Sequence, residues 1–187
     1  MQCQRLIFRQ SFHHELTRRF ISAFSAIWKT YAPNNHITSL ASHRKAVTCL
    51  AFLPKNPASS SSYSPFEPQL PGGPLLLSGS ADSTLILWSP LSPPPDNKVR
   101  RYRHHRAIVN CVAPSPSDVT LFASGSDDAD ICIWRVDERK PWEVLKVGYP
   151  VTAIEWTKDG SGLFVGGLDN QIHVSLSVPM ELPLHGP

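Results

Sequence analysis

Two segments of this chain repeat one another, and each of them ends in a tryptophan. Residues 78–88 read SGSADSTLILW and residues 124–134 read SGSDDADICIW. In each copy, an apolar stretch that ends in Ser-Gly is joined to a second apolar stretch through a turn that holds an aspartate. Self-similarity at a period of tens of residues is typical of folds that stack one small structural unit several times. We therefore expect this chain to be a repeat protein.

The repeat extends beyond these two segments. Residues 43–50 (HRKAVTCL) align without gaps on residues 105–112 (HRAIVNCV), and a third, weaker copy runs from residue 151 to residue 175. The third copy keeps the aspartate of the turn but has lost the histidine, the serine and the tryptophan of the other two. The retained aspartate is Asp169. Val147 stands in place of the histidine, Val165 in place of the serine and Ser175 in place of the tryptophan.

Short apolar stretches separated by turn residues predict strands throughout the repeats. The stretches that end in tryptophan are apolar without alternation, which is typical of strands covered on both faces. The predicted fold class is therefore all-β. The predicted strands, in chain order, are 47–52, 75–79, 84–88, 98–102, 109–113, 120–124, 130–135, 143–147, 151–156, 163–166 and 171–176.

The composition is that of a globular chain, with 41% hydrophobic and 18% charged residues among 187. A net charge of +3 does not by itself indicate binding to nucleic acid or to a membrane, and no apolar run approaches the length that spans a bilayer. The four cysteines show no metal-binding or redox spacing. Cys49 and Cys111 occupy equivalent positions inside apolar runs, so we expect small buried residues in a reducing compartment, and no metal site.

Residues 40–178 hold the repeats, and two regions lie outside the pattern. We expect residues 1–39 to be a helical or disordered extension, because apolar residues between Leu6 and Tyr31 are compatible with one helical face. The Arg-rich, acid-poor composition there resembles a presequence that would direct the chain to mitochondria, but we favour a divergent N-terminal segment. Serine, proline and glycine dominate residues 55–74 and predict a disordered insertion, and residues 179–187 form a tail.

The segments that run from Ser-Gly to tryptophan resemble the WD repeat. This resemblance implies a β-propeller, in which four-stranded blades surround a central channel and loops on one face form the binding surface. Propellers of this family typically have seven blades, whereas this chain supplies about three. We therefore expect an incomplete ring that is open and marginally stable on its own. The chain departs from the family after each tryptophan, where Ser89 and Arg135 replace the usual aspartate.

In the WD-repeat family, a loop histidine, a strand serine, a turn aspartate and the closing tryptophan form a hydrogen-bonded set. The resemblance implies this structural role for two full sets and one remnant: His43, Ser78, Asp82 and Trp88; His105, Ser124, Asp128 and Trp134; and Asp169. Histidine, serine and aspartate are also the residues of a catalytic triad. Because the set recurs in two copies, we expect it to be structural, and we predict a non-catalytic protein without a cofactor or a small-molecule substrate.

Within the family, residues 98–174 most resemble the WD-repeat proteins of the U5 small nuclear ribonucleoprotein, through the segments KVRRYRHH and GGLDNQI. This resemblance implies a nuclear scaffold in pre-mRNA splicing that contacts the large U5 core protein and touches RNA at most indirectly. The alternative is an adaptor of another complex, such as a ubiquitin ligase or a chromatin assembly, which also leaves a cytoplasmic location open. The candidate partner-binding residues lie in loops and turns of one face: Arg44, Lys45, Arg106, Asp127, Tyr149 and Leu168.

Residues 98–106 form a basic run with five cations and no acid. Basic residues on an outer strand protect the edge of a sheet from pairing with another chain, and this is the role that we favour. The alternative is contact with phosphates in a ribonucleoprotein. The run lacks the interleaved aromatic residues of a base-stacking platform.

Overall fold

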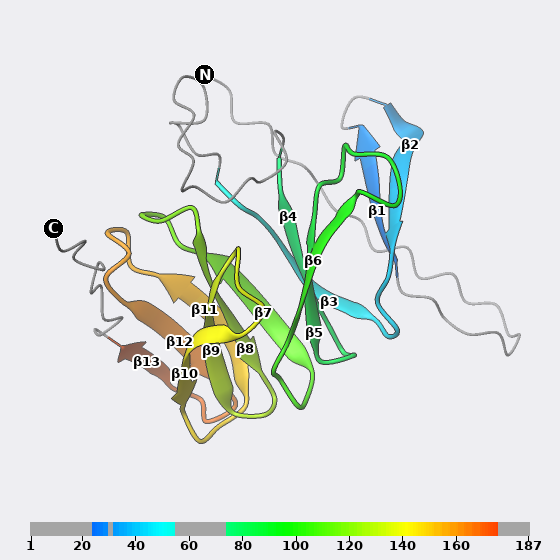
Figure 1. The fold of residues 1–187 in the computed structure, drawn as a ribbon. Helices are drawn as coiled ribbons and strands as arrows, with labels where there is room; N and C mark the ends of the chain where they lie inside the picture. Colours follow the sequence, from blue (N-terminus) through cyan, green and yellow to red (C-terminus); the bar gives the residue numbers. More distant parts are fainter. Residues whose placement is uncertain (1–23, 30–31, 55–73, 176–187) are drawn as a thin grey trace, which may run out of the picture.

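The computed structural model describes residues 24–29, 32–54 and 74–175 of the 187-residue chain (Figure 1). These residues form thirteen strands, arranged in four antiparallel sheets, and the described part of the chain contains no helix. The all-β prediction is therefore confirmed. Residues 55–73 of the insertion predicted over 55–74, the tail and the N-terminal residues 1–23 lie outside the described residues.

Three of the sheets correspond to the three repeats, and each follows its strands in chain order. The first sheet contains β3 (Val47–Phe52), β4 (Leu76–Ser80), β5 (Thr84–Trp88) and β6 (Lys98–Arg103). The middle sheet contains β7 (Val109–Pro114), β8 (Leu121–Ser126), β9 (Asp130–Arg135) and β10 (Pro141–Lys146). The third sheet contains β11 (Val151–Trp156), β12 (Leu163–Gly167) and β13 (Ile172–Ser175). The predicted strand bounds agree with these to within two residues.

The three sheets pack face to face, so the middle sheet is covered on both sides (Figure 1). Strand β9 shows how this is encoded. Cys132 and Trp134 face the core that the middle sheet shares with the first sheet. Ile131 and Ile133 face the core shared with the third sheet. An apolar stretch without alternation is thus explained by burial on two faces, as in incomplete propeller blades.

The glycine of each Ser-Gly pair lies where the next sheet comes closest. A Cβ atom on Gly79 would lie 2.5 Å from Cys49 Sγ and 2.8 Å from Val109 Cγ1 of the middle sheet. A Cβ atom on Gly125 would lie 2.4 Å from Val151 Cγ1 of the third sheet. These two positions therefore have no room for a side chain, and the Ser-Gly motif is a packing requirement between neighbouring sheets.

The turn after the second strand of each repeat places one residue in the left-handed conformation. Ser83, Ala129 and Asn170 occupy the same position in the three turns, with φ angles of 62°, 65° and 63°. Each follows the aspartate of its turn. The three repeats therefore share this turn backbone even where the third sequence has diverged.

The N-terminal extension departs from the helical prediction where the structure describes it. Residues Phe24–Lys29 form β1, which pairs antiparallel with β2 (Ala32–Ala41) in the fourth sheet. The helix expected between Leu6 and Tyr31 is therefore wrong for residues 24–29. Their backbone groups form hydrogen bonds with the neighbouring strand β2, and not with residues of the same segment as in a helix. Strand β2 also continues through the expected boundary at residue 39. Its residue Leu40 is buried against Leu76, Ile86 and Trp88 of the first sheet.

Candidate protein-interaction face

A chain of hydrogen bonds runs through the first sheet from its tryptophan to the turn aspartate. Trp88 Nε1 donates to Ser78 Oγ at 2.8 Å, and Ser78 Oγ lies 2.8 Å from His43 Nε2. The other ring nitrogen, His43 Nδ1, lies 3.2 Å from Asp82 Oδ2. An indole N–H can only donate, so we assign the serine O–H as donor to Nε2 and Nδ1–H as donor to the carboxylate. This assignment leaves the histidine neutral and every group paired.

The middle sheet repeats the arrangement with equivalent atoms. Trp134 Nε1 donates to Ser124 Oγ at 2.8 Å, and Ser124 Oγ lies 2.8 Å from His105 Nε2. His105 Nδ1 lies 3.0 Å from Asp128 Oδ2. The structure thus brings together all four residues of each of the two sets that the resemblance implied.

The two aspartates also tie the loop before each first strand to the turn between the second and third strands. Asp82 accepts a hydrogen bond from the backbone N–H of Arg44, and Asp128 accepts one from that of Arg106, each at 2.8 Å. Each carboxylate further accepts from the backbone N–H two residues along its own turn. Loop and turn therefore form one rigid corner at the same end of each sheet.

Burial sets the charge state of these groups. It lowers the pKa of both histidines below the ordinary value, and this effect outweighs the attraction of the neighbouring carboxylates. Burial alone would raise the pKa of both aspartates. The hydrogen bonds that they accept outweigh it, lowering the pKa of Asp128 and holding that of Asp82 at about 2. At neutral pH each set therefore contains an ionised carboxylate and a neutral imidazole.

Unlike the serine of a catalytic triad, the serines of the two sets are not accessible to a substrate. Ser78 and Ser124 are fully buried, with no exposed surface. Each hydroxyl is already engaged by an indole N–H and an imidazole, as described above. A substrate cannot reach these oxygens, so the two sets serve the fold.

The third turn replaces the buried set with a more open one. Asp169 Oδ2 lies 2.6 Å from Nε2 of His173, a residue of β13 that lies four positions further along the chain. The ring of Tyr149 stacks on His173, with centroids 4.6 Å apart. His173 was not predicted from the sequence, because the family pattern places the histidine before the first strand of each repeat. Its spacing of four residues from the turn aspartate is the signal that could have identified it.

Two side chains bridge neighbouring sheets at the starts of their first strands. The hydroxyl of Thr48 donates to the backbone carbonyl of Val109, and Asn110 Nδ2 donates to the carbonyl of Val151 at 2.9 Å. Strands β3, β7 and β11 therefore begin side by side. Because each loop–turn corner lies at the start of one of these strands, the three corners share one edge of the molecule. Sequence reasoning did not identify either bridging residue.

The candidate partner-binding residues lie along this shared edge, which we call the corner face. Arg44, Lys45, Arg106 and Asp127 are exposed, Leu168 is 67% exposed and Tyr149 is half-buried; Ile108, not identified from the sequence, is 38% exposed. One ion pair crosses the face, between Arg106 Nη2 and Asp130 Oδ2 at 3.4 Å. Accessible arginine and tyrosine side chains are enriched in protein-binding surfaces.

The cysteines of the described residues are not activated thiols. Cys132 is buried and Cys49 and Cys111 are half-buried. Burial raises the pKa of the Cys49 thiol to about 11 and that of Cys111 to about 12, so both stay protonated at neutral pH. Within the described residues, no three His, Cys, Asp or Glu side chains converge as a metal site. That part of the chain also holds no helix able to cross a bilayer.

Comparison with known protein families and curated proteins gives a consistent picture. The family described as WD domain, G-beta repeat matches residues 69–89, 96–135 and 142–174, which together make up about half of the chain. The matched segments cover parts of all three repeats, including the diverged third copy.

Three curated proteins illustrate the range of similar chains. The pre-mRNA-splicing factor cwf17 of Schizosaccharomyces pombe is 27% identical over 51% of this chain, and the match spans 27% of that protein. The uncharacterized WD repeat-containing protein C18H10.05 of the same yeast is 37% identical over 49% of this chain, spanning 15% of its own length. The B-type cell cycle switch protein ccs52B of Medicago truncatula is 32% identical over 53% of this chain and is matched over 21% of its length. The chain thus spans about a quarter or less of these relatives.

Proposed function

Since this chain belongs to the WD-repeat family, whose members are generally non-catalytic scaffolds for protein interactions, we propose that it is such a scaffold in pre-mRNA splicing. The corner face is the binding surface in this proposal. The main support for it is the pair of inter-sheet bridges, which bring loops from all three repeats to one edge. A partner can therefore contact three repeats at once, without any of the corners having to rearrange.

Two features support splicing as the setting. Similarity to a pre-mRNA-splicing factor covers about half of the chain. The GGLDNQI turn of the third repeat and the basic last strand of the first repeat also support splicing, through their resemblance to WD-repeat proteins of the U5 small nuclear ribonucleoprotein. In this proposal the protein is nuclear, belongs to the U5 small nuclear ribonucleoprotein and contacts its large core protein. It has no catalytic role, consistent with the burial of both serine hydroxyls.

An adaptor of another complex is the second candidate. It is supported by the cell cycle switch protein, which is 32% identical over a similar share of the chain. The two candidates differ in which partners they require. Both use the corner face, so the same variants serve to test them.

Affinity purification of the tagged full-length protein from its own cells, followed by mass spectrometry, tests the proposal. We expect splicing proteins to co-purify with the native chain. The double variant Arg106→Glu/Leu168→Asp should lose them, since both side chains are exposed on the corner face. The control Leu91→Asp/Lys158→Glu makes matched changes at exposed positions on the opposite edge.

Two results would contradict the proposal. If another complex is recovered in place of splicing proteins, the adaptor candidate is correct. If splicing proteins are recovered equally with both double variants, the corner face is not the binding surface.

A further inference from the structure

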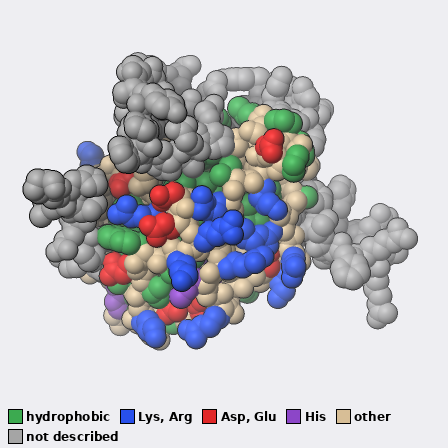
Figure 2. Space-filling view, in the orientation of Figure 1, with side chains coloured by type: hydrophobic (Ala, Val, Ile, Leu, Met, Phe, Trp, Pro, Cys, Tyr) green, Lys and Arg blue, Asp and Glu red, His purple; other side chains and the backbone are tan. Residues whose placement is uncertain are grey.

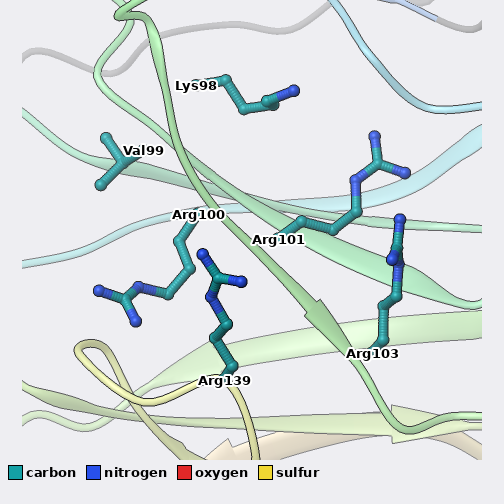
Figure 3. Close-up of a pocket in the computed structure, with 6 residues that line it drawn as sticks. All are labelled: Lys98, Val99, Arg100, Arg101, Arg103 and Arg139. Carbon is teal, nitrogen blue, oxygen red and sulfur yellow. The ribbon is translucent and has the colours of Figure 1, made fainter.

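A groove beside the edge strand β6 concentrates positive charge that the corner face does not use. It has a volume of about 480 Å³ and is lined by Lys98, Val99, Arg100, Arg101, Arg103 and Arg139 (Figure 3). Five of these six residues are cations and none is an acid. Figure 2 shows lysine and arginine side chains gathered over this part of the molecule.

The groove is more than the basic run seen in the sequence, because Arg139 comes from a different sheet. This residue lies in the connection between β9 and β10 of the middle sheet, and its side chain lies beside that of Arg100 (Figure 3). Protection of a sheet edge requires cations on the edge strand alone. Two guanidinium groups brought together from separate sheets repel each other, and a bound anion would offset this repulsion.

Among the described residues, the carboxylate of Asp82 acts electrostatically on Arg101, but it forms no salt bridge with it. Arg101 Nη2 donates to the carbonyl and the hydroxyl of Ser42, at 2.5 and 2.7 Å, and Arg100 donates to the backbone carbonyl of Asp137. These acceptors are uncharged. No groove cation forms a salt bridge with a described residue. Two arginines are thus held in place by neutral groups, and the others remain free to bind an anion.

The lining favours phosphate over a peptide. Segments of protein that bind in a groove generally bury apolar anchor residues, and the groove offers one aliphatic residue, Val99. Binding to the backbone of a nucleic acid requires cations but no apolar pocket. Arginine, which makes up four of the five cations, matches phosphate oxygens with two parallel N–H donors.

We infer that this groove binds the phosphodiester backbone of RNA through its phosphates, without reading its sequence. The inference goes beyond the proposed scaffold role and replaces the edge-protection role that the sequence favoured for these cations. It assigns direct RNA contact to side chains other than those named for the corner face, which the groove adjoins where Arg101 contacts Ser42. The variants that test RNA binding change none of the residues that test partner binding, so the two proposals can fail independently.

Fluorescence anisotropy with a labelled 12-nucleotide oligouridine, titrated with the full chain at 50–200 mM KCl, tests this inference. The variant Arg103→Gln/Arg139→Gln removes two exposed groove cations for which the structure shows no side-chain hydrogen bond among the described residues. The control Lys146→Gln/Lys158→Gln removes two exposed cations outside the groove. Far-ultraviolet circular dichroism of all three proteins verifies that folding is unchanged.

We expect the native chain and the control to bind oligouridine with a similar dependence on salt. For the groove variant, the slope of log affinity against log salt should fall in magnitude by about 1.4, at about 0.7 for each lost phosphate contact on a single strand. Its affinity at 50 mM salt should fall by about tenfold or more.

Three results would overturn the inference. They are no binding by the folded native chain, equal weakening in the groove variant and the control, and polyglutamate of equal charge binding as tightly as RNA. If the binding of polyglutamate is also lost in the groove variant, the groove binds an acidic segment of a protein.

Discussion

Each buried histidine of the two hydrogen-bonded sets is neutral in the folded protein, and this makes stability depend on pH. The unfolded chain takes up protons near pH 6.5, whereas folding lowers the pKa of His43 and His105. The free energy of unfolding should therefore fall as the pH drops below about 6.5, by up to about 1.4 kcal/mol per pH unit for each histidine. Below about pH 4 the aspartates add to the loss, because Asp82 has a pKa of about 2 when folded.

Urea unfolding between pH 7.5 and pH 5, followed by tryptophan fluorescence, measures this dependence. The double variant His43→Gln/His105→Gln should be less stable at pH 7.5, since two hydrogen-bond chains are disturbed. It should also lose most of the dependence on pH above pH 5, because the titrating groups are gone. A native protein whose stability is constant from pH 7.5 to pH 5 would show that the histidines are not held neutral.

Packing between whole sheets depends on the glycines at the ends of their second strands. Gly125→Ala should destabilise the fold by about 1–3 kcal/mol, because the new methyl group would lie 2.4 Å from Val151 Cγ1 and 2.8 Å from Cys111 Sγ. Gly166 is the equivalent residue of the third sheet, where the nearest atom to a new methyl group would be Ala153 Cβ at 3.6 Å. Gly166→Ala is therefore the matched control and should change stability by less than about 0.5 kcal/mol. Equal losses in thermal unfolding would disprove this account of the Ser-Gly motif.

The strands of the repeats were predictable because their pattern combines turn residues with apolar stretches that must be buried on two faces. Ile131 to Trp134 show this most clearly, since consecutive side chains enter two different cores. The hairpin of β1 and β2 was not predictable, because its pairing is set by contacts between strands and its sequence does not match the repeat. Contacts such as that of Thr48 with Val109 also join distant segments, and local sequence carries little information about them.

At the scale of the whole molecule, the outer face of the third sheet carries an exposed apolar patch. Phe164 and Val174 are paired across β12 and β13, and they are 42% and 53% exposed; Ile172, on the same face, is 80% exposed. Apolar patches of this kind promote association. We expect this chain, expressed alone, to self-associate as its concentration rises, and Phe164→Lys/Val174→Lys to reduce this association. Sedimentation velocity measures it, with Leu91→Lys as the control at an exposed leucine outside the patch.

If the control suppresses self-association as strongly as the double variant, the patch is not the contact surface. A native chain that stays monomeric over a hundredfold range of concentration would likewise contradict the prediction.

The hydrogen bonds of two of the buried tryptophans give each of two sheets its own spectroscopic probe. The indole N–H groups of Trp88 and Trp134 are bonded to serine oxygens and shielded from water. Their protons can exchange with deuterium only when the surrounding sheet opens. Two indole resonances in a proton NMR spectrum would therefore report on the opening of the first and the middle sheets separately, in a single sample and without any added label.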